Sequence, residues 1–322
     1  MVAENIIDEF DYLVQSFWEE NADFGTLGTP IWTSFLGGSR NEGNIWPEFP
    51  LFGGSIEDGT PSIAVKNFDG VAHPVGFLYL VGNTLSTDIT IIPVDGAYSQ
   101  PTKPNGSTDI YDGIIFKLNA SGFISWSTYL GGQNGHTTIT GVELDNTDNL
   151  YICGGTEGGN LFPIVDPGGS AYVENTGNAF ISKFANNGEP IWSTRFGVGS
   201  GDVSAERATD LTEFDGTIAV VGRTDDDGFT PMATAYQDTY GGDIGDGFII
   251  RFNSDYSFDW STYIGLDKKD YLRTITHNLE GDYFIGGNSF SDANIDAYID
   301  ATLEAGGGDL WATPQGEGDA LL

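Results

Sequence analysis

The sequence is poor in several residue types on which protein chemistry often depends. Its 322 residues include one cysteine, three histidines and 12 lysines and arginines, against 47 aspartates and glutamates, so the net charge is −35. One cysteine permits no internal disulfide, and no two histidines have the spacing of zinc ligands. A chain with so little positive charge is a poor partner for nucleic acids and anionic membranes, because both are bound through basic patches.

Long apolar runs and nucleophile motifs are lacking as well. No stretch of about 20 apolar residues occurs, so no transmembrane helix is expected. The opening MVAENIIDEF has neither the basic nor the apolar region of a signal peptide. A Walker loop, a G-x-S-x-G elbow and a CxxC pair are all missing. The sequence therefore carries no signature of nucleophilic catalysis, and we expect a protein that is not an enzyme.

The chain is rich in repetition. A segment close to Ile-x-Trp-Ser-Thr-Tyr-x-Gly-Gly recurs around Trp32, Trp126, Trp192 and Trp260. The last three tryptophans are 66 and 68 residues apart, which indicates a repeat of about 67 residues. The first interval is longer because residues 39–59 extend one connection.

Three further landmarks recur in fixed order between successive tryptophans. An apolar segment with glycine occupies 79–84, 151–156, 219–224 and 283–288. An Ala-Tyr pair follows at Ala97, Ala171, Ala235 and Ala297. An apolar run then begins at Asp112, Asn178, Asp246 and Asp319. Four ordered landmarks make chance similarity among apolar residues a poor explanation.

Each repeat is predicted to form four strands, because short apolar runs rich in Ile, Val, Phe, Tyr and Thr alternate with Gly, Asn and Asp. In the third complete repeat the expected strands are 208–214, 217–224, 247–253 and 258–264. Tight hairpin turns are expected at Asp215-Gly216 and around Ser254-Asp255. One four-stranded antiparallel sheet every 67 residues or so predicts an all-β fold, a β-propeller built from such blades.

We expect one propeller array over residues 1–322 rather than several domains. Complete blades are expected over about 60–132, 138–199 and 205–265, with a partial blade over 9–38 and an incomplete one over 273–322. Both terminal copies supply the same third strand, so the expectation is a piece of a longer chain. A compact four-bladed ring closed by the Trp32 strand is the alternative.

The repeated residues have structural explanations that compete with functional ones. The tryptophans are expected to fill the gap between blades, with a carbohydrate-stacking row as the alternative. The glycines would let neighbouring backbones approach closely. Cys153, within 151–156, is expected to be a small buried hydrophobe. His136 and His277 are expected in or beside the first strands of their blades.

Carboxylates are the remaining chemically interesting groups. Asp225, Asp226 and Asp227 open the loop between the second and third strands of one repeat, which also carries Asp238, Asp243 and Asp246. Oxygen ligands on a loop containing glycine suit Ca²⁺, so these three aspartates are candidate calcium ligands. A solvated acidic turn is the competing interpretation. The recurrent Asp112, Asp246 and Asp319 are expected to accept hydrogen bonds from backbone N–H groups of turns.

The order of landmarks resembles the bacterial β-propeller repeat family often called the SBBP repeat. Phe162-Pro163, Ala235-Tyr236-Gln237 and 126–132 carry the resemblance, which extends over nearly the whole chain. The resemblance implies a secreted or cell-surface protein, as in Bacteroidetes-type bacteria that export cargo by the type 9 secretion system. It implies no single activity and no catalytic residues. Residues 39–59 and Asn178 depart from the pattern.

The expected function is therefore non-catalytic binding at the cell surface or outside the cell. The partner would be a protein, a glycan or another subunit of a surface assembly, bound through the long loops that join second to third strands. No nucleic acid partner or direct membrane insertion is expected, and Ca²⁺ is the one candidate cofactor. Two alternatives remain: a glycan-active hydrolase or lyase with paired carboxylates, and a structural segment of a surface filament.

Overall fold

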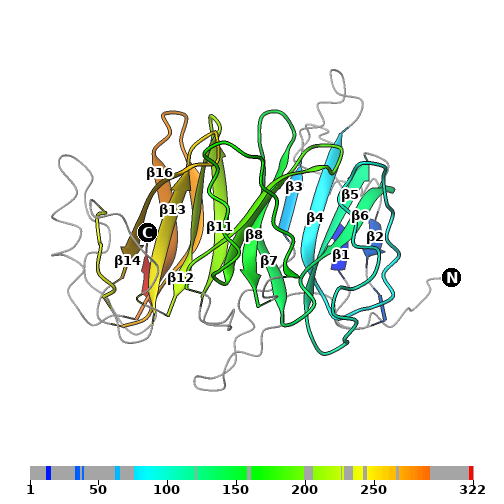
Figure 1. Ribbon diagram of the computed structural model, residues 1–322, viewed down its shortest axis with the longest axis horizontal. Coiled ribbons are helices and arrows are strands. Elements are labelled where there is room, and N and C mark those ends of the chain that lie inside the picture. Colours follow the sequence, from blue (N-terminus) through cyan, green and yellow to red (C-terminus); the bar gives the residue numbers. More distant parts are fainter. Residues whose placement is uncertain are drawn as a thin grey trace, which may run out of the picture. The chain divides into compact units, whose positions relative to one another are not determined.

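A computed structural model of the chain describes thirteen segments and the strands within them. The described residues are 12–15, 33–36, 38–39, 62–65, 76–119, 122–157, 161–198, 206–225, 227, 235–241, 245–265, 268–290 and 319–321. The regular elements named in this part of the chain are all strands, β1 to β17 (Figure 1), so the predicted all-β class is confirmed. Within the same residues, no helix is long and apolar enough to cross a membrane.

The chain folds as two compact units. The first contains residues up to Tyr151 together with Thr156–Pro163 and Lys183–Ile191. The second contains Ile152–Gly155, Ile164–Ser182 and the chain from Trp192 onward.

The first unit holds a four-stranded antiparallel sheet ordered β3-β4-β5-β6. These strands are β3 (Ser62–Val65), β4 (Phe77–Thr84), β5 (Asp112–Asn119) and β6 (Ile124–Leu130). A separate antiparallel pair joins β1 (Tyr12–Gln15) to β2 (Thr33–Leu36). This pairing agrees with the prediction that the two segments are third and fourth strands of one repeat.

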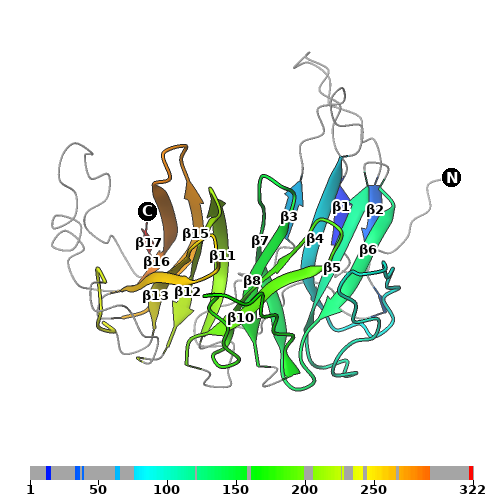
Figure 2. The same ribbon diagram turned by 45° about the horizontal axis from the view of Figure 1, so that its top comes forward.

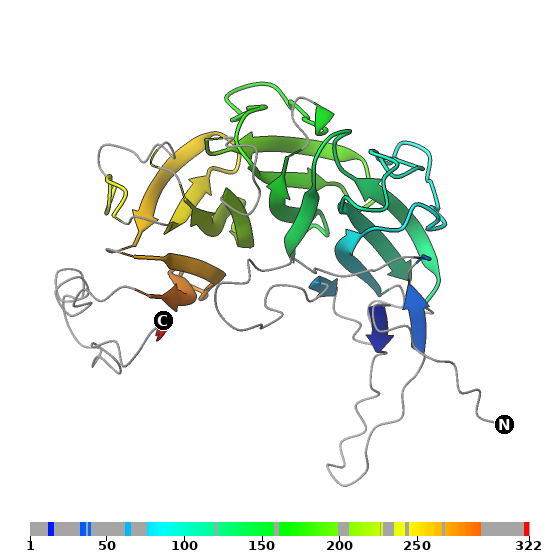
Figure 3. The same cartoon turned by 90° about the horizontal axis from the view of Figure 1, so that it is seen from below.

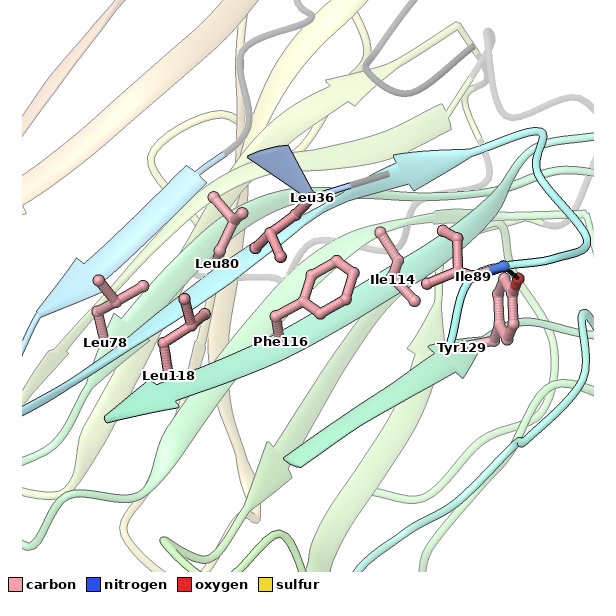
Figure 4. Close-up of a cluster of buried hydrophobic side chains, with 8 residues drawn as sticks. All are labelled: Leu36, Leu78, Leu80, Ile89, Ile114, Phe116, Leu118 and Tyr129. Atoms are coloured by element: carbon pink, nitrogen blue, oxygen red, sulfur yellow. Dashed lines mark hydrogen bonds between the residues drawn. The ribbon is translucent and has the colours of Figure 1, made fainter. Parts of the chain in front are cut away.

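The core of the first unit follows the two-residue period of its strands. Alternate side chains of β4 and β5 turn to one face, where they pack with Leu36 of β2 (Figure 4). The buried members of this cluster are Leu36, Leu78, Leu80, Ile89, Ile114, Phe116, Leu118 and Tyr129. The Tyr129 hydroxyl accepts a hydrogen bond from the Ile89 backbone N–H at 3.2 Å, so the loop after β4 is held against this core.

A second sheet has the order β7-β8-β9-β10. Its strands are β7 (Thr137–Leu144), β8 (Leu150–Thr156), β9 (Ala179–Phe184) and β10 (Pro190–Phe196). Strand β7 lies against the preceding sheet, where Asn83 makes two hydrogen bonds to the backbone of Ile139, at 2.7 and 3.3 Å. The first sheet therefore holds the first strand of the second sheet in place.

The second unit holds the antiparallel sheet β11-β12-β13-β14 and the three-stranded sheet β15-β16-β17 (Figure 2). Figure 3 shows the β11 to β14 sheet from below, in yellow-green to gold. The strands are β11 (Glu206–Phe214), β12 (Thr217–Thr224), β13 (Asp246–Phe252), β14 (Phe258–Ile264), β15 (Asp270–His277), β16 (Tyr283–Ser289) and β17 (Asp319–Leu321). The predicted strands 217–224 and 258–264 match, and the others differ by one or two residues. Asp215 and Gly216 have φ of 50° and 85°, as the predicted tight hairpin requires.

The recurrent glycine of the second strand lies close to the backbone of the first strand in the same sheet. A Cβ on Gly222 would approach the carbonyl oxygen of Arg207 in β11 closer than 3.0 Å, and a Cβ on Gly287 would do the same to Tyr271 in β15. Both contacts lie beside register shifts in the first strand, at Ala208/Asp210 and Leu272/Thr274. The predicted close backbone approach is present, and its cause is a β-bulge in the adjacent strand.

Candidate functional site

Buried polar side chains gather at one end of the strands in each sheet. The residues concerned begin or precede the third strand, end the second strand, or begin the first strand of the next sheet. We call these groups the first junction (Thr84, Asp112, Thr137), the second junction (Asn178, Glu206) and the third junction (Thr224, Asp246, Asp270). Each member is at most 2% exposed. Buried polar groups are costly unless hydrogen-bonded, so their partners show what each junction can do.

The first junction contains a buried ion pair. The Lys103 ammonium donates to Asp112 Oδ2 at 2.9 Å and to Asn105 Oδ1 at 3.1 Å, and it also contacts the Ile110 carbonyl oxygen. The Asn105 amide donates to the same Asp112 oxygen at 2.6 Å. Burial raises the pKa of Asp112 to about 6, although Lys103 and Asn105 lower it. The ammonium balances the single carboxylate of this junction.

The second junction replaces the aspartate with Asn178 and supplies a carboxylate from the next strand. Glu206 accepts hydrogen bonds from the backbone N–H of Asn178 at 3.1 Å and from that of Val198 at 2.8 Å. Burial lowers the pKa of the Arg195 guanidinium, and the charge of Glu206 raises it. One buried acid therefore interacts with one buried base here too.

The third junction has two carboxylates. Asp246 Oδ2 accepts from the Gly241 backbone N–H at 2.6 Å and from the Gln237 amide at 3.5 Å, whereas its Oδ1 is buried without a hydrogen-bond partner. Asp270 begins the next sheet, and its backbone N–H donates to the Gly245 carbonyl at 2.8 Å. Burial raises the pKa of Asp246 to about 6, opposed by the Gly241 hydrogen bond and reinforced by the charge of Asp270.

A glutamine and a glycine enclose the aspartate at two junctions. Gln100 accepts from the Gly131 backbone N–H and donates to the Gly131 carbonyl, both at 3.0 Å. Gln237 accepts from the Gly265 backbone N–H at 3.0 Å. A Cβ on Gly131 or Gly265 would lie within 3.0 Å of the aspartate Oδ1. The recurrent glycine that ends the Trp-Ser-Thr-Tyr-x-Gly segment therefore makes room for the carboxylate.

The same residues fasten the loop that joins the second and third strands. Gln100 N–H donates to Thr128 Oγ1, and the Tyr129 N–H donates to the Gln100 carbonyl, at 2.8 and 3.3 Å. The corresponding pairs of bonds join Glu174 to Thr194 and Arg195, and Gln237 to Thr262 and Tyr263, at 2.9 to 3.1 Å. Each loop therefore has a fixed base on the fourth strand of its own sheet.

Trp126 and Trp192 occupy positions between sheets, as predicted. Trp126 packs against Phe184, and a Cβ on Gly188 would meet its ring. Trp192 stacks on Tyr256 with ring centroids 5.0 Å apart. Trp126 and Trp192 are at most 2% exposed, and a buried ring cannot serve as a sugar-stacking platform. Trp260 is half-buried, and Trp32 lies outside the described residues.

The tyrosine of the recurrent Ala-Tyr pair supplies the hydrogen-bond acceptor for the buried indole N–H group. The indole N–H of Trp126 donates to the Tyr98 carbonyl at 3.1 Å, and that of Trp192 donates to the Tyr172 carbonyl at 2.9 Å. Two landmarks of the repeat are therefore hydrogen-bond partners.

The predicted calcium ligands are only partly placed. Asp225 and Asp227 are exposed, and Asp226 lies outside the described residues. Asp225 Oδ1 lies beside Gly245, since a Cβ on that glycine would meet it at 2.5 Å. Among the residues that the structure describes, no three His, Cys, Asp or Glu side chains converge so as to hold a metal ion. Calcium binding at 225–227 stays a prediction.

The predicted turn-capping role agrees with the partners of both recurrent aspartates whose side chains are described. Asp246 accepts from the Gly241 backbone N–H in its preceding loop. Asp112 accepts from the side chains of Lys103 and Asn105, and a backbone hydrogen bond from Asn105 also lowers its pKa. Both are buried first residues of strands instead of exposed turn residues. The side chain of Asp319 lies outside the described part.

The cysteine and two histidines lie where they were expected. Cys153 is a buried free thiol in β8. His136 directly precedes β7 and its Nδ1 accepts from the Tyr111 N–H at 3.1 Å. His277 ends β15 beside Thr212, with Nδ1 and Oγ1 2.8 Å apart. His73 falls outside the described residues.

The repeat pattern contained a signal for residues that the predictions missed. Gln100, Glu174 and Gln237 follow the Ala-Tyr landmark by one or two residues, so aligning that landmark would have identified the loop fastening. Lys103 and Asp270 carry no such signal. The residue types at these two positions do not recur in the other repeats. Only the folded arrangement of loop and strands brings Lys103 and Asp270 to a junction.

The comparisons with known proteins agree with this repeat architecture. Residues 125–163, from β6 through β8 to the loop after it, match the family model described as SBBP, beta-propeller repeat. A comparison with curated proteins gave no match. This stretch is a β-propeller repeat of the SBBP type.

Proposed function

We propose that the sheets are blades of a propeller and that the chain is a non-catalytic binding module of a secreted or cell-surface protein. The loops between second and third strands would supply the recognition surface. The observation that carries the proposal is the shared fastening of these loops. In each four-stranded sheet, a residue one or two positions after the Ala-Tyr pair makes two hydrogen bonds to the fourth strand, as described for Gln100, Glu174 and Gln237.

A fixed base with an exposed tip suits recognition, because ordering a flexible loop on binding costs free energy. The tips carry exposed aspartates at Asp95, Asp166 and Asp227. Apolar side chains are exposed in the same loops at Val94 and Leu161, which are 40% and 51% exposed. Mixed acidic and apolar surface favours a protein partner with a basic contact surface.

The charge of the chain supports the same choice. A net charge of −35 repels acidic partners and accelerates association with basic ones. The buried carboxylates Asp112, Glu206 and Asp246 are enclosed, which favours a structural or ion-binding use over contact with a glycan substrate. We therefore rank protein binding above glycan hydrolysis.

The test compares two triple charge reversals. Asp95→Lys, Asp166→Lys and Asp227→Lys change the loop tips, and Glu189→Lys, Asp255→Lys and Glu280→Lys make the same charge change in the tight hairpin turns. Binding to immobilised lysine-rich peptides is measured by surface plasmon resonance, with a glycan array as a second probe. The loop variant is expected to lose binding that the turn variant retains. Equal binding by both variants, or none by the native chain, would contradict the proposal.

A further inference from the structure

The sheet β15-β16-β17 differs from the four-stranded sheets in how its second strand is paired. Strand β4 pairs with β5 over eight residues, and β12 pairs with β13 over seven. Strand β16 pairs with β17 over three residues, 287–289. In the described part of the chain, residues 283–286 of β16 therefore pair with β15 alone. Such an edge carries backbone N–H and C=O groups that can pair with a further strand.

The same stretch of β16 is exposed. The last residue of β16 pairs with the first residue of β17, as the last residue of β4 pairs with the first residue of β5. Counting back five residues from each end makes Phe284 the counterpart of Tyr79. Phe284 is 57% exposed, whereas Tyr79 is 0% exposed and packs edge-on against Trp126, with ring centroids 6.3 Å apart. In the first sheet a fourth strand therefore covers the face that Phe284 exposes.

Strands β1 and β2 have the register of a third and a fourth strand. Tyr12, the first residue of β1, lies opposite Leu36, the last residue of β2. Gly113 and Leu130 lie opposite each other in the first sheet, and Leu130, like Leu36, precedes a Gly-Gly pair. Among the described strands, β1 pairs with β2 alone. The pair β1-β2 and the pair β15-β16 therefore correspond to the two halves of one four-stranded sheet.

These two halves belong to different units of the chain. Leu36 holds β2 in the first unit, because it shares a core cluster with Leu78 and Leu80. Strands β15 and β16 belong to the second unit. Each copy of the chain therefore carries both complementary surfaces, and contacts between two different surfaces of identical chains join copies head to tail.

We propose that the chain associates with a second copy of itself, whose β1 pairs with β16 in the place of β17 and whose β2 adds the fourth strand. In this register Gln15 of the second copy lies opposite Ile285. The corresponding pair in the first sheet is Phe116 and Leu80. The exchange replaces the three residue pairs of β17 with two strands joined by main-chain hydrogen bonds, and the added β2 covers the face of Phe284. This inference is independent of the proposed loop recognition.

The first test is sedimentation of the native chain over a range of concentrations. Dimers and larger head-to-tail species should form as the concentration rises. Each copy carries a net charge of −35, so association should strengthen when NaCl screens the repulsion between copies. Phe284→Lys should weaken association by about tenfold or more, because a charge on a strand edge disfavours pairing. Leu279→Lys, at a turn residue that is 93% exposed, is the control and should leave association unchanged.

The second test identifies the partner and the register. Chains carrying Gln15→Cys are mixed with chains carrying Ile285→Cys and oxidised, and the linked peptides are identified by mass spectrometry. Directly opposite side chains are close enough for a disulfide, and the native Cys153 is buried. The expected product joins positions 15 and 285 of different chains. Val14→Cys should not link to Ile285→Cys, because a shift of one residue turns the side chain to the other face.

Three results would overturn the proposal. The first is a native chain that stays monomeric at every protein and salt concentration. The second is equal association by the Phe284→Lys and Leu279→Lys variants, which places the interface elsewhere. The third is a chain carrying both Gln15→Cys and Ile285→Cys that links within itself while the mixed single variants do not link, which shows that β1 completes the sheet of its own chain.

Discussion

The indole N–H of Trp192 donates a 2.9 Å hydrogen bond to the carbonyl oxygen of Tyr172. The same bond joins Trp126 to Tyr98 at 3.1 Å. Each bond connects the fourth strand of a sheet to the loop before its third strand, while the indole ring packs against the following sheet. One residue thus links the loop to the packing between sheets.

Replacing Trp192 should therefore be costly. Trp192→Ala removes a buried ring and is expected to lower the free energy of unfolding by about 3–5 kcal/mol. Trp192→Phe keeps part of the packing and loses the hydrogen bond, so a smaller loss is expected. Urea unfolding followed by circular dichroism measures both. Trp260→Ala, at a half-buried position, is the control, and an equal loss there would contradict the assigned role.

Gly131 lacks a side chain, and this leaves room for the Asp112 carboxylate. We therefore expect substitutions at these two positions to have non-additive effects on the free energy of unfolding. Gly131→Ala places a methyl group within 3.0 Å of Asp112 Oδ1 and should destabilise the protein by about 1–3 kcal/mol through overpacking. Asp112→Ala removes the obstructing carboxylate, so the double variant should lose less than the sum of the single losses. Strict additivity in a double-mutant cycle would show that the two residues do not interact.

The buried ion pair of Lys103 and Asp112 should matter more than an exposed one. Lys103→Met leaves the enclosed carboxylate without its cation and is expected to cost about 3–5 kcal/mol. The half-exposed pair of Arg251 and Asp259, 2.9 Å apart, supplies the matched control. Arg251→Met should cost about 1 kcal/mol or less. Chemical unfolding of both variants at pH 7 compares them, and similar losses would refute the distinction.

Asp145 should produce a definite pH dependence. Burial raises its pKa, but hydrogen bonds from Asn149 and Thr147 and the charge of Lys183 outweigh burial, so the pKa lies below its usual value. A lowered pKa contributes stability above the unfolded pKa of about 3.9 that is lost as the pH falls through the folded value.

Asp145→Asn should therefore be less stable than the native chain at pH 7, and the difference should shrink toward pH 3. Thermal unfolding across this range measures it. Asp255→Asn, at a fully exposed turn, is the comparison and should show a weaker trend. A difference between Asp145→Asn and the native chain that stays constant with pH would contradict the assignment.

The strands were predictable because local chemistry determines them. The segment Thr217–Thr224 alternates apolar and small residues and follows an Asp-Gly turn, and its predicted bounds agree with the structure. Strand β11 begins at Glu206, two residues before the predicted start. Charged residues such as Glu206 and Arg207 do not indicate a strand in the sequence pattern. The fold nevertheless buries both of them within β11.

The junctions were less predictable because they depend on register. Residues 283–288 were aligned by their glycines, yet the pairing of Ser289 with Asp270 makes Gly287 the counterpart of Gly222. A shift of one residue is invisible where two glycines adjoin. Lys103 reaches Asp112 across a nonrepeated loop, and no pattern of spacing indicates that contact.

Amide hydrogen exchange tests most directly the claim that each loop between second and third strands has a rigid base and an exposed tip. The backbone amides of Gln100, Glu174 and Gln237 should exchange as slowly as strand amides, because each donates to a threonine hydroxyl of the fourth strand. Tip amides around Asp95 and Gly169 should exchange much faster. Fast exchange at all three fastening residues would contradict the account.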